Sequence, residues 1–325
     1  MKQAILRQDR KTCGSCTDFS EDFGRTVMTG NKKAKKTDKK SIMGNKETIM
    51  KAIFFTAACT SILAVALICM FLFVNGIPAI AEIGVSDFLM GTSWKPNNTP
   101  PSFGILPMIL GSICVTAGAV LVGVPVGVLT AVFMVGYCPQ KLYCILKPAM
   151  DLLAGIPSIV YGFFGLMVIV PFIRDVFGGA GNSILAASIL LGIMILPTVT
   201  SVCESAIRAV PRAYYEGALA LGASHERSIF SVVLPAAKSG IMAAIVLGTG
   251  RAIGETMAVI MVAGNQARMP SGLLKGVRTL TANIIIEMGY AAELHREALI
   301  ATGVVLFAFI LAINLLLSLV KRRAA

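Results

Sequence analysis

Two residues of opposite charge lie inside a strongly apolar stretch of the chain. Arg251 and Glu255 are four residues apart in the run 239–263, and Gly250 and Gly254 repeat that spacing. A charge at bilayer depth costs roughly 2.5–3.5 kcal/mol on insertion scales, so such charges are rare and usually line a substrate or ion path. On a helix, this spacing predicts both charged groups on one face. It also predicts a flat glycine strip that another backbone can approach closely.

The charge pair has two interpretations. In the first, Arg251 and Glu255 form a buried brace that neutralises itself. In the second, an anion passes here and Arg251 is its counter-charge, because the planar guanidinium matches the geometry of an oxyanion. A brace could be replaced by two apolar residues without loss, which favours the second interpretation.

The composition predicts an all-α membrane protein. Of 325 residues, 56% are hydrophobic and only 14% are charged, which is too apolar for a soluble domain of this size. Long apolar runs predict about six membrane spans, near residues 52–74, 104–136, 148–173, 183–203, 239–263 and 298–320. With only two His residues, a His-based catalytic centre or zinc site has little to use. We therefore expect no catalytic residue, metal or cofactor.

The polar segments predict how the chain is organised and oriented. Residues 1–46 are polar and basic and cannot bury a core, so we expect a disordered cytoplasmic tail followed by a membrane domain, 47–325. Basic residues are concentrated in this tail, in 137–147, in 204–238 and at 321–323. The positive-inside rule then puts both termini in the cytosol of a multi-pass protein of the cytoplasmic membrane.

The predicted span 148–173 carries a break signal. Pro157 removes a helical hydrogen bond, and Gly155 and Gly162 loosen the chain on either side. In lipid, such a break is tolerated only where neighbouring protein or a wet cavity satisfies the backbone. Two interpretations remain open: a kinked packing helix, or a broken helix that lines a pathway.

The polar stretch 204–238 carries a motif. It reads Glu216-Gly217-Ala218, then Gly222, then Val232-Val233-Leu234-Pro235. This resembles the signature of ABC importer permeases, which is Glu-Ala-Ala, three residues, Gly, nine residues and Ile-x-Leu-Pro. Gly217 and Val232 are mild departures from it. The resemblance implies the type I ABC importer permease fold, with a cytoplasmic coupling helix that docks on an ATPase through Glu216, Gly217, Ala218, Gly222, Leu234 and Pro235.

A narrower resemblance concerns the PstC-type permeases of phosphate importers. The stretches that carry it are 103–107, 153–162, 193–197 and, most specifically, 250–259 with Arg-Ala-Ile-Gly-Glu. It implies the permease subunit of an ATP-driven importer of inorganic phosphate, with the substrate pathway lined by Arg251, Glu255, Thr256, Ser158 and Tyr161.

The same resemblance implies partners. These are a PstA-like sister permease, two ATP-binding cassette subunits and an extracytoplasmic phosphate-binding protein, with no nucleic acid. The sequence has no Gly-x4-Gly-Lys-Ser/Thr loop, so we expect the partners, and not this chain, to hydrolyse ATP. The alternatives are an ABC permease for sulfate or molybdate, and a secondary anion carrier that needs no ATPase.

Overall fold

The structure is a computed structural model that describes residues 40–324, and its regular elements are almost all helices. In chain order they are α3 (Lys40–Ile83), α4 (Val85–Met90), β1 (Trp94–Lys95), β2 (Ser102–Phe103), α5 (Leu106–Gly136), α6 (Gln140–Gly155), α7 (Ser158–Phe164), the π-helix η1 (Gly165–Ile169), α8 (Val170–Phe177), α9 (Ile184–Arg208), α10 (Arg212–Ala220), α11 (His225–Ser228), the π-helix η2 (Ile229–Val233), α12 (Leu234–Ala236), α13 (Lys238–Gly254), α14 (Met257–Val262), α15 (Leu280–Met288) and α16 (Glu293–Ala324).

The chain divides into two compact units, Met1–Ala64 and Val65–Ala325, and α3 runs through the boundary. The described part of the first unit is the N-terminal part of α3, and all other elements belong to the second unit. The predicted tail lies outside the described residues up to residue 39. Residues 40–46 are helical and begin α3.

Five helical segments among the described residues are long and apolar enough to cross a membrane, and α11–α12 with α13 make a sixth if that bent pair is one span. The five are Thr48–Ile83, Leu106–Gly136, Ser158–Phe177, Ile184–Arg208 and Glu293–Leu316. The structure divides the expected span 148–173 between the end of α6 and the run α7–α8. The expected span 183–203 continues as helix to Arg208.

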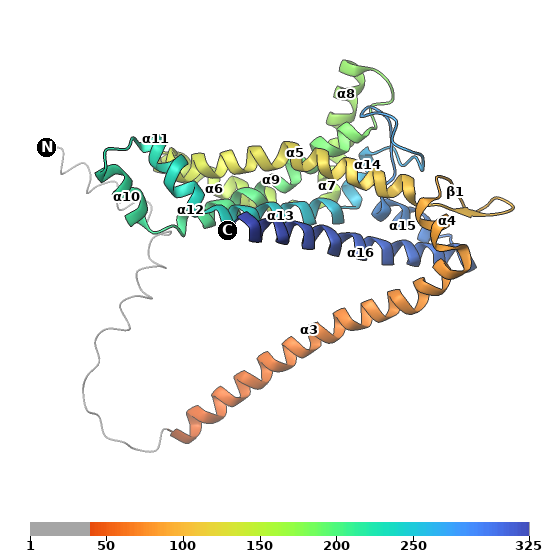
Figure 1. The fold of residues 1–325 in the computed structure, drawn as a ribbon, viewed down its shortest axis with the longest axis horizontal. Helices are drawn as coiled ribbons and strands as arrows, with labels where there is room; N and C mark the ends of the chain where they lie inside the picture. The colour runs from red at the N-terminus through yellow and green to blue at the C-terminus, as the bar shows by residue number, and fades with distance from the viewer. Residues whose placement is uncertain (1–39, 325) are drawn as a thin grey trace. The chain divides into compact units, whose positions relative to one another are not determined.

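Small residues let α9 pack closely on its neighbours in the second unit. A Cβ atom added at Gly123 in α5 would lie 2.7 Å from the Gly192 carbonyl oxygen of α9, and one at Gly248 in α13 would lie 2.7 Å from Val199. Such residues allow the close backbone approach on which helix packing in membranes depends. Figure 1 shows α5, α9, α13 and α16 running side by side. The α10–α12 segment, residues 212–236, lies at one end of these helices, and α4, β1 and α15 lie at the other.

Candidate functional site

The helix that carries Arg251 ends before Glu255. Helix α13 stops at Gly254, and Glu255 has the extended values φ −70° and ψ 128°. The expectation of one continuous helix with both charges on one face was therefore wrong. The break is supported by side chains: Glu255 Oε1 accepts from Ala258 N at 3.3 Å, and Thr281 Oγ1 donates to the Glu255 carbonyl at 3.3 Å. These bonds take over backbone groups that an unbroken helix would pair internally.

Arg251 bonds to a threonine and not to Glu255. Its Nη1 donates to Thr198 Oγ1 of α9 at 2.8 Å. The ion pairs among the described residues do not include Arg251 with Glu255, so the interpretation as a self-neutralising brace is contradicted. A guanidinium carries five N–H donors, and the bond to Thr198 uses one of them. The arrangement suits a cation that meets an anion from outside the chain.

One face of α13 is not covered by the described residues. Leu247, Gly250, Arg251 and Gly254 follow the helical spacing i, i+3, i+4 and i+7. Leu247 is 53% exposed, and a Cβ atom added at Gly250 or Gly254 would find no described atom within 4 Å beyond its own turn of helix. The flat glycine strip expected from the sequence is thus present and open, and partly buried Arg251 lies on the same face.

The second break, between α6 and α7, is bridged by Tyr161. Ile156 and Pro157 are extended, with ψ 129° and 140°, and the Tyr161 hydroxyl donates across the break to the Leu153 carbonyl at 2.8 Å. Ser158 begins α7 and is partly buried. A Cβ atom at Gly162 would lie 2.8 Å from Met261 Sδ. Helix α7 therefore packs against α14, which directly follows Glu255 and Thr256. At that other break, the Thr256 hydroxyl donates to the Gly254 carbonyl at 3.2 Å.

The motif residues of the α10–α12 segment form a projecting turn. Glu216, Gly217 and Pro235 are exposed, Leu234 is partly buried and Ala218 is buried. Gly222 has φ 84°, a left-handed conformation that favours glycine. Glu216 and Leu234 both line a cavity of about 570 Å³ between this segment and the ends of α5 and α9. Four large apolar side chains of the segment are also exposed: Leu221 at 91%, Tyr214 at 54%, Phe230 at 52% and Leu219 at 39%.

His225 fixes this turn to the end of α5. Its Nε2 lies 3.0 Å from the Gly136 carbonyl oxygen, and its Nδ1 lies 2.7 Å from the Tyr215 hydroxyl. A carbonyl can only accept, so Nε2 carries a proton. In the neutral imidazole, Nδ1 then accepts from Tyr215. The His225 side chain thereby ties α10 and α11 to α5.

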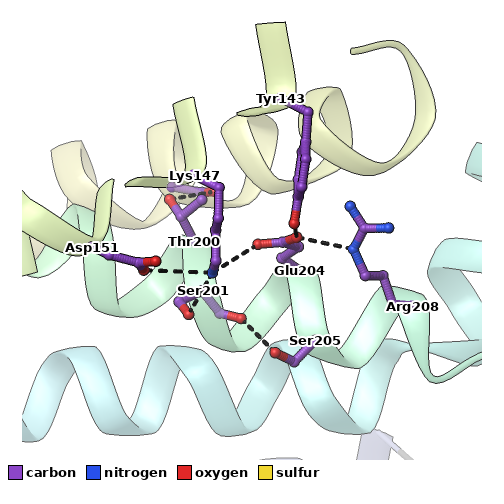
Figure 2. Close-up of polar contacts among 9 residues, drawn as sticks. Tyr143, Lys147, Asp151, Thr200, Ser201, Glu204, Ser205 and Arg208 are labelled. Carbon is purple, nitrogen blue, oxygen red and sulfur yellow. Dashed lines mark hydrogen bonds and ion pairs between the residues drawn. The ribbon is translucent and has the colours of Figure 1, made fainter. Parts of the chain in front are cut away.

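A buried carboxylate in α9 was missed by sequence reasoning, which placed Glu204 at the start of a polar loop. The Glu204 side chain is 4% exposed. It accepts from the Tyr143 hydroxyl at 2.6 Å and from Lys147 Nζ at 3.1 Å, both in α6, and from Arg208 Nε at 2.9 Å. Figure 2 shows these three donors converging on one carboxylate. A signal was available in the sequence. Tyr143 and Lys147 are four residues apart in α6, and Glu204 and Arg208 are four residues apart in α9, so each pair lies on one face of its helix.

Both α6 donors keep their protons at neutral pH. Burial and the hydrogen bond to Glu204 raise the pKa of Tyr143. Burial by itself would lower the pKa of Lys147, but the hydrogen bond and charge of Glu204, with the charge of Asp151, raise that pKa above the ordinary lysine value. Glu204 therefore faces a neutral phenol and two cations.

A second buried carboxylate, Glu287 of α15, lies at the other end of the second unit. It accepts from the indole N–H of Trp94 at 2.7 Å, lies 2.9 Å from His295 Nε2 and pairs with Arg278. Arg278 and His295 are nine and eight positions from Glu287, but Trp94 is 193 positions away, so no local pattern predicted the contact with the indole. It joins the β1–β2 hairpin to α15 and α16. Among the described residues, no group of three or more His, Cys, Asp or Glu side chains could hold a metal ion.

Comparisons with known proteins agree on one kind of membrane protein. Residues 123–325 match the family described as binding-protein-dependent transport system inner membrane component. YqgH of Bacillus subtilis, a probable ABC transporter permease protein, is 40% identical over 277 residues, covering 82% of this chain and 90% of that protein. The phosphate transport system permease protein PstC of Mesorhizobium japonicum is 35% identical over 257 residues, covering 73% and 78%.

Two solved structures share the fold. A bacterial alginate ABC transporter in complex with an alginate-bound periplasmic protein matches with a TM-score of 0.60 at 16% identity, covering 86% of this chain and 96% of that chain. The MetNI methionine ABC transporter matches with a TM-score of 0.52 at 22% identity, covering 68% and 94%. At these identities, the likeness concerns the fold alone.

Proposed function

Because this chain belongs to the family of binding-protein-dependent transport system inner membrane components, and its all-α fold is that of ABC importer permeases, we propose that it is the subunit through which an ATP-driven importer moves inorganic phosphate. Relatives with 31–36% identity include phosphate transport permeases named PstC. The basic residues of 137–147 and 204–238 support a topology with both termini in the cytosol.

The observation that carries the proposal is the incompletely bonded Arg251 on the open face of α13. Thr198 engages one N–H group, and the glycines beside it leave room for a solute or a second subunit. A planar fork of donors suits a phosphate oxyanion better than the point charge of a lysine. The passing anion would supply the counter-charge that the described part of the chain does not place in an ion pair with Arg251.

The other expected pathway residues divide into two roles in this proposal. Glu255 uses one carboxylate oxygen to cap α14, and its second oxygen can accept from the hydroxyl of protonated phosphate, which fully ionised sulfate lacks. Ser158 offers a hydroxyl at the start of α7. Tyr161 and Thr256 donate to backbone carbonyls beside the two breaks, so they shape the pathway wall and leave anion contact to the other residues.

Docking on the ATP-hydrolysing partner is assigned to the α10–α12 segment. Its exposed Glu216 and Gly217, its exposed apolar side chains and the adjoining cavity support a fit into a partner's groove. We expect Glu216→Lys to abolish co-purification with the ATPase and Glu82→Lys, at an exposed site on α3, to preserve it. Equal recovery of the ATPase with both variants would remove this assignment.

The central experiment uses the complex of this chain with its sister permease, ATPases and binding protein in proteoliposomes. We expect phosphate to stimulate ATP hydrolysis and to enter the vesicles, and Arg251→Gln to abolish uptake while the complex still assembles. Arg268→Gln, the same change at an exposed arginine, is the matched control. Full uptake by Arg251→Gln would refute the role. Stimulation by sulfate or molybdate in place of phosphate would identify a different oxyanion, and uptake without any ATPase would identify a secondary carrier.

A further inference from the structure

The Glu204 cluster joins two helices that lead to different parts of the site. On one side, α9 ends at Arg208, one turn after Glu204, and α10 begins at Arg212. On the other side, α6 carries Tyr143 and Lys147 and ends at Gly155, just before the break that precedes α7. The cluster therefore lies between the α10–α12 segment and the broken helix of the proposed pathway.

The cluster is built to hold α6 and α9 together firmly. Bonds from cations to a carboxylate are about twice as strong as neutral ones. Glu204 receives one from Lys147 of α6, in addition to the Tyr143 hydroxyl of α6, and a second one from Arg208 of its own helix. The Arg208 guanidinium also stacks over the Tyr143 ring at 4.8 Å from its centroid. Lys147 bonds to Ser201 Oγ at 3.3 Å as well. The polar contacts in Figure 2 thus cross between the helices at several points.

The connection continues past the end of α6. Tyr161 bonds α7 to the Leu153 carbonyl of α6, and Gly162 brings α7 into close contact with α14. The extended residues Ile156 and Pro157 leave only a two-residue link between α6 and α7, and the Tyr161 hydrogen bond spans that link. These contacts connect α6 through α7 to α14, which begins beside Glu255.

We propose that Glu204 is a positioning residue that makes α6 move with the α10–α12 segment, so that motion of the docked ATPase reaches the α7–α14 pair. The inference rests on the proposed function, since it assumes that this segment receives the ATPase. Glu204 does not touch the transported anion. The α10–α12 segment is joined covalently to the pathway through α12 and α13. Glu204 adds a second, non-covalent route from that segment, through α9 and α6, by which movement of the ATPase reaches the pathway.

The test measures anion uptake per ATP hydrolysed in the reconstituted complex. Glu204→Gln keeps the side-chain shape but removes the charge that holds Lys147 and Arg208. We expect ATP hydrolysis to continue while the ratio of uptake to hydrolysis falls roughly tenfold, within the range of typical coupling energies. Lys147→Met, which breaks the cluster from α6, should lower the ratio by a similar factor. The double variant should show no further loss, because both changes remove the same connection.

Asp151→Asn is the matched control. It removes one negative charge that lies 3.6 Å from the same Lys147. The Asp151 side chain is 59% exposed, and among the described residues its ion pair is with Lys147 of its own helix and not with α9. We expect an unchanged ratio. A folding role alone would lower the amount of assembled complex and leave the ratio of the remaining complex intact. That result, or the failure of both cluster variants to assemble, would overturn the proposal.

The experiment distinguishes failure of the proposed function from failure of the proposed role of Glu204. If the proposed function is wrong, the complex with the unaltered chain will not take up phosphate. The ratio is then measured with whichever anion stimulates ATP hydrolysis. If the proposal on Glu204 is wrong, the unaltered complex will transport and only the cluster variants will behave unexpectedly.

Discussion

Arg251 and Glu204 are both charged groups on helices of the second unit, yet their surroundings differ. Glu204 is 4% exposed and receives three donors from two helices. Arg251 is only partly buried, has a hydroxyl as its side-chain partner and faces a glycine strip that the described residues leave open. The described residues supply counter-charges to Glu204 and form no ion pair with Arg251.

This difference separates two uses of a charge in a membrane protein. A carboxylate whose acceptor sites are filled by fixed donors holds elements in place, and it has little capacity left for a mobile ligand. A guanidinium with unused donors can exchange partners as an anion arrives and leaves. The number of bonds supplied by the chain itself thus distinguishes a positioning group from a substrate contact.

The largest expected effect on stability comes from removing Glu204, whose carboxylate accepts from three donors. Glu204→Leu leaves Lys147 and Arg208 without their shared partner. Both cations are partly exposed, at 30% and 47%, so they can turn to water, and the cost is that of the lost hydrogen bonds to a charged group, roughly 1.5–3 kcal/mol each. We expect a clear fall in the midpoint of thermal unfolding of the detergent-solubilised chain. Arg251→Leu is the comparison variant and should leave the midpoint nearly unchanged. If both variants lowered it equally, the distinction between the two charges would be lost.

Two glycines, Gly162 in the packed contact of α7 with α14 and Gly250 on the open face of α13, give an intermediate effect. A Cβ atom at Gly162 would lie 3.0 Å from the Ala258 Cα atom, whereas one at Gly250 would meet no described atom within 4 Å. Overpacking typically costs about 1–3 kcal/mol, so Gly162→Ala should destabilise the chain and Gly250→Ala should not. Thermal unfolding of the two variants checks this.

A larger side chain at the open strip sharpens the same comparison. Gly250→Leu should leave the isolated chain stable but reduce its assembly with the sister permease, if that partner covers the strip. Size-exclusion chromatography of the co-expressed subunits measures this. Destabilisation of the isolated chain by Gly250→Leu would mean that the strip is packed within the chain.

The sequence predicted much of the fold because its signals are local. Apolar runs predicted about six spans, and five helical segments among the described residues, or six with the bent pair that ends at Gly254, are long and apolar enough. The expected span 239–263 is interrupted after Gly254. The motif from Glu216 to Pro235 lies on the α10–α12 segment. Pro157 marked the first helix break, because proline has a direct effect on the backbone. The break after Gly254 was missed, because it depends on Thr281 and on the capping of α14 by Glu255.

The candidate site was predicted in part for the same reason. Arg251 was noticeable because a charge in an apolar run is rare. Its partner Thr198 was not, since a threonine in a helix is ordinary and lies 53 positions away. Glu204 was read as the start of a loop, because the donors from α6 that allow its burial lie about 60 residues earlier in the chain.

The smallest expected effect tests the single bond that orients Arg251. Thr198→Val keeps the side-chain volume and removes the hydroxyl that accepts from Nη1. A hydrogen bond contributes about 0.5–1.5 kcal/mol net, so uptake at subsaturating phosphate should fall roughly two- to tenfold, because the guanidinium is less often correctly placed. Thr200→Val is the matched control: it removes a hydroxyl that donates to the Gly127 carbonyl of α5 at 3.2 Å, on the side of α9 away from Arg251. Initial uptake rates across phosphate concentrations measure both variants. A similar loss in both would mean that α9 packing, and not the orientation of Arg251, limits transport.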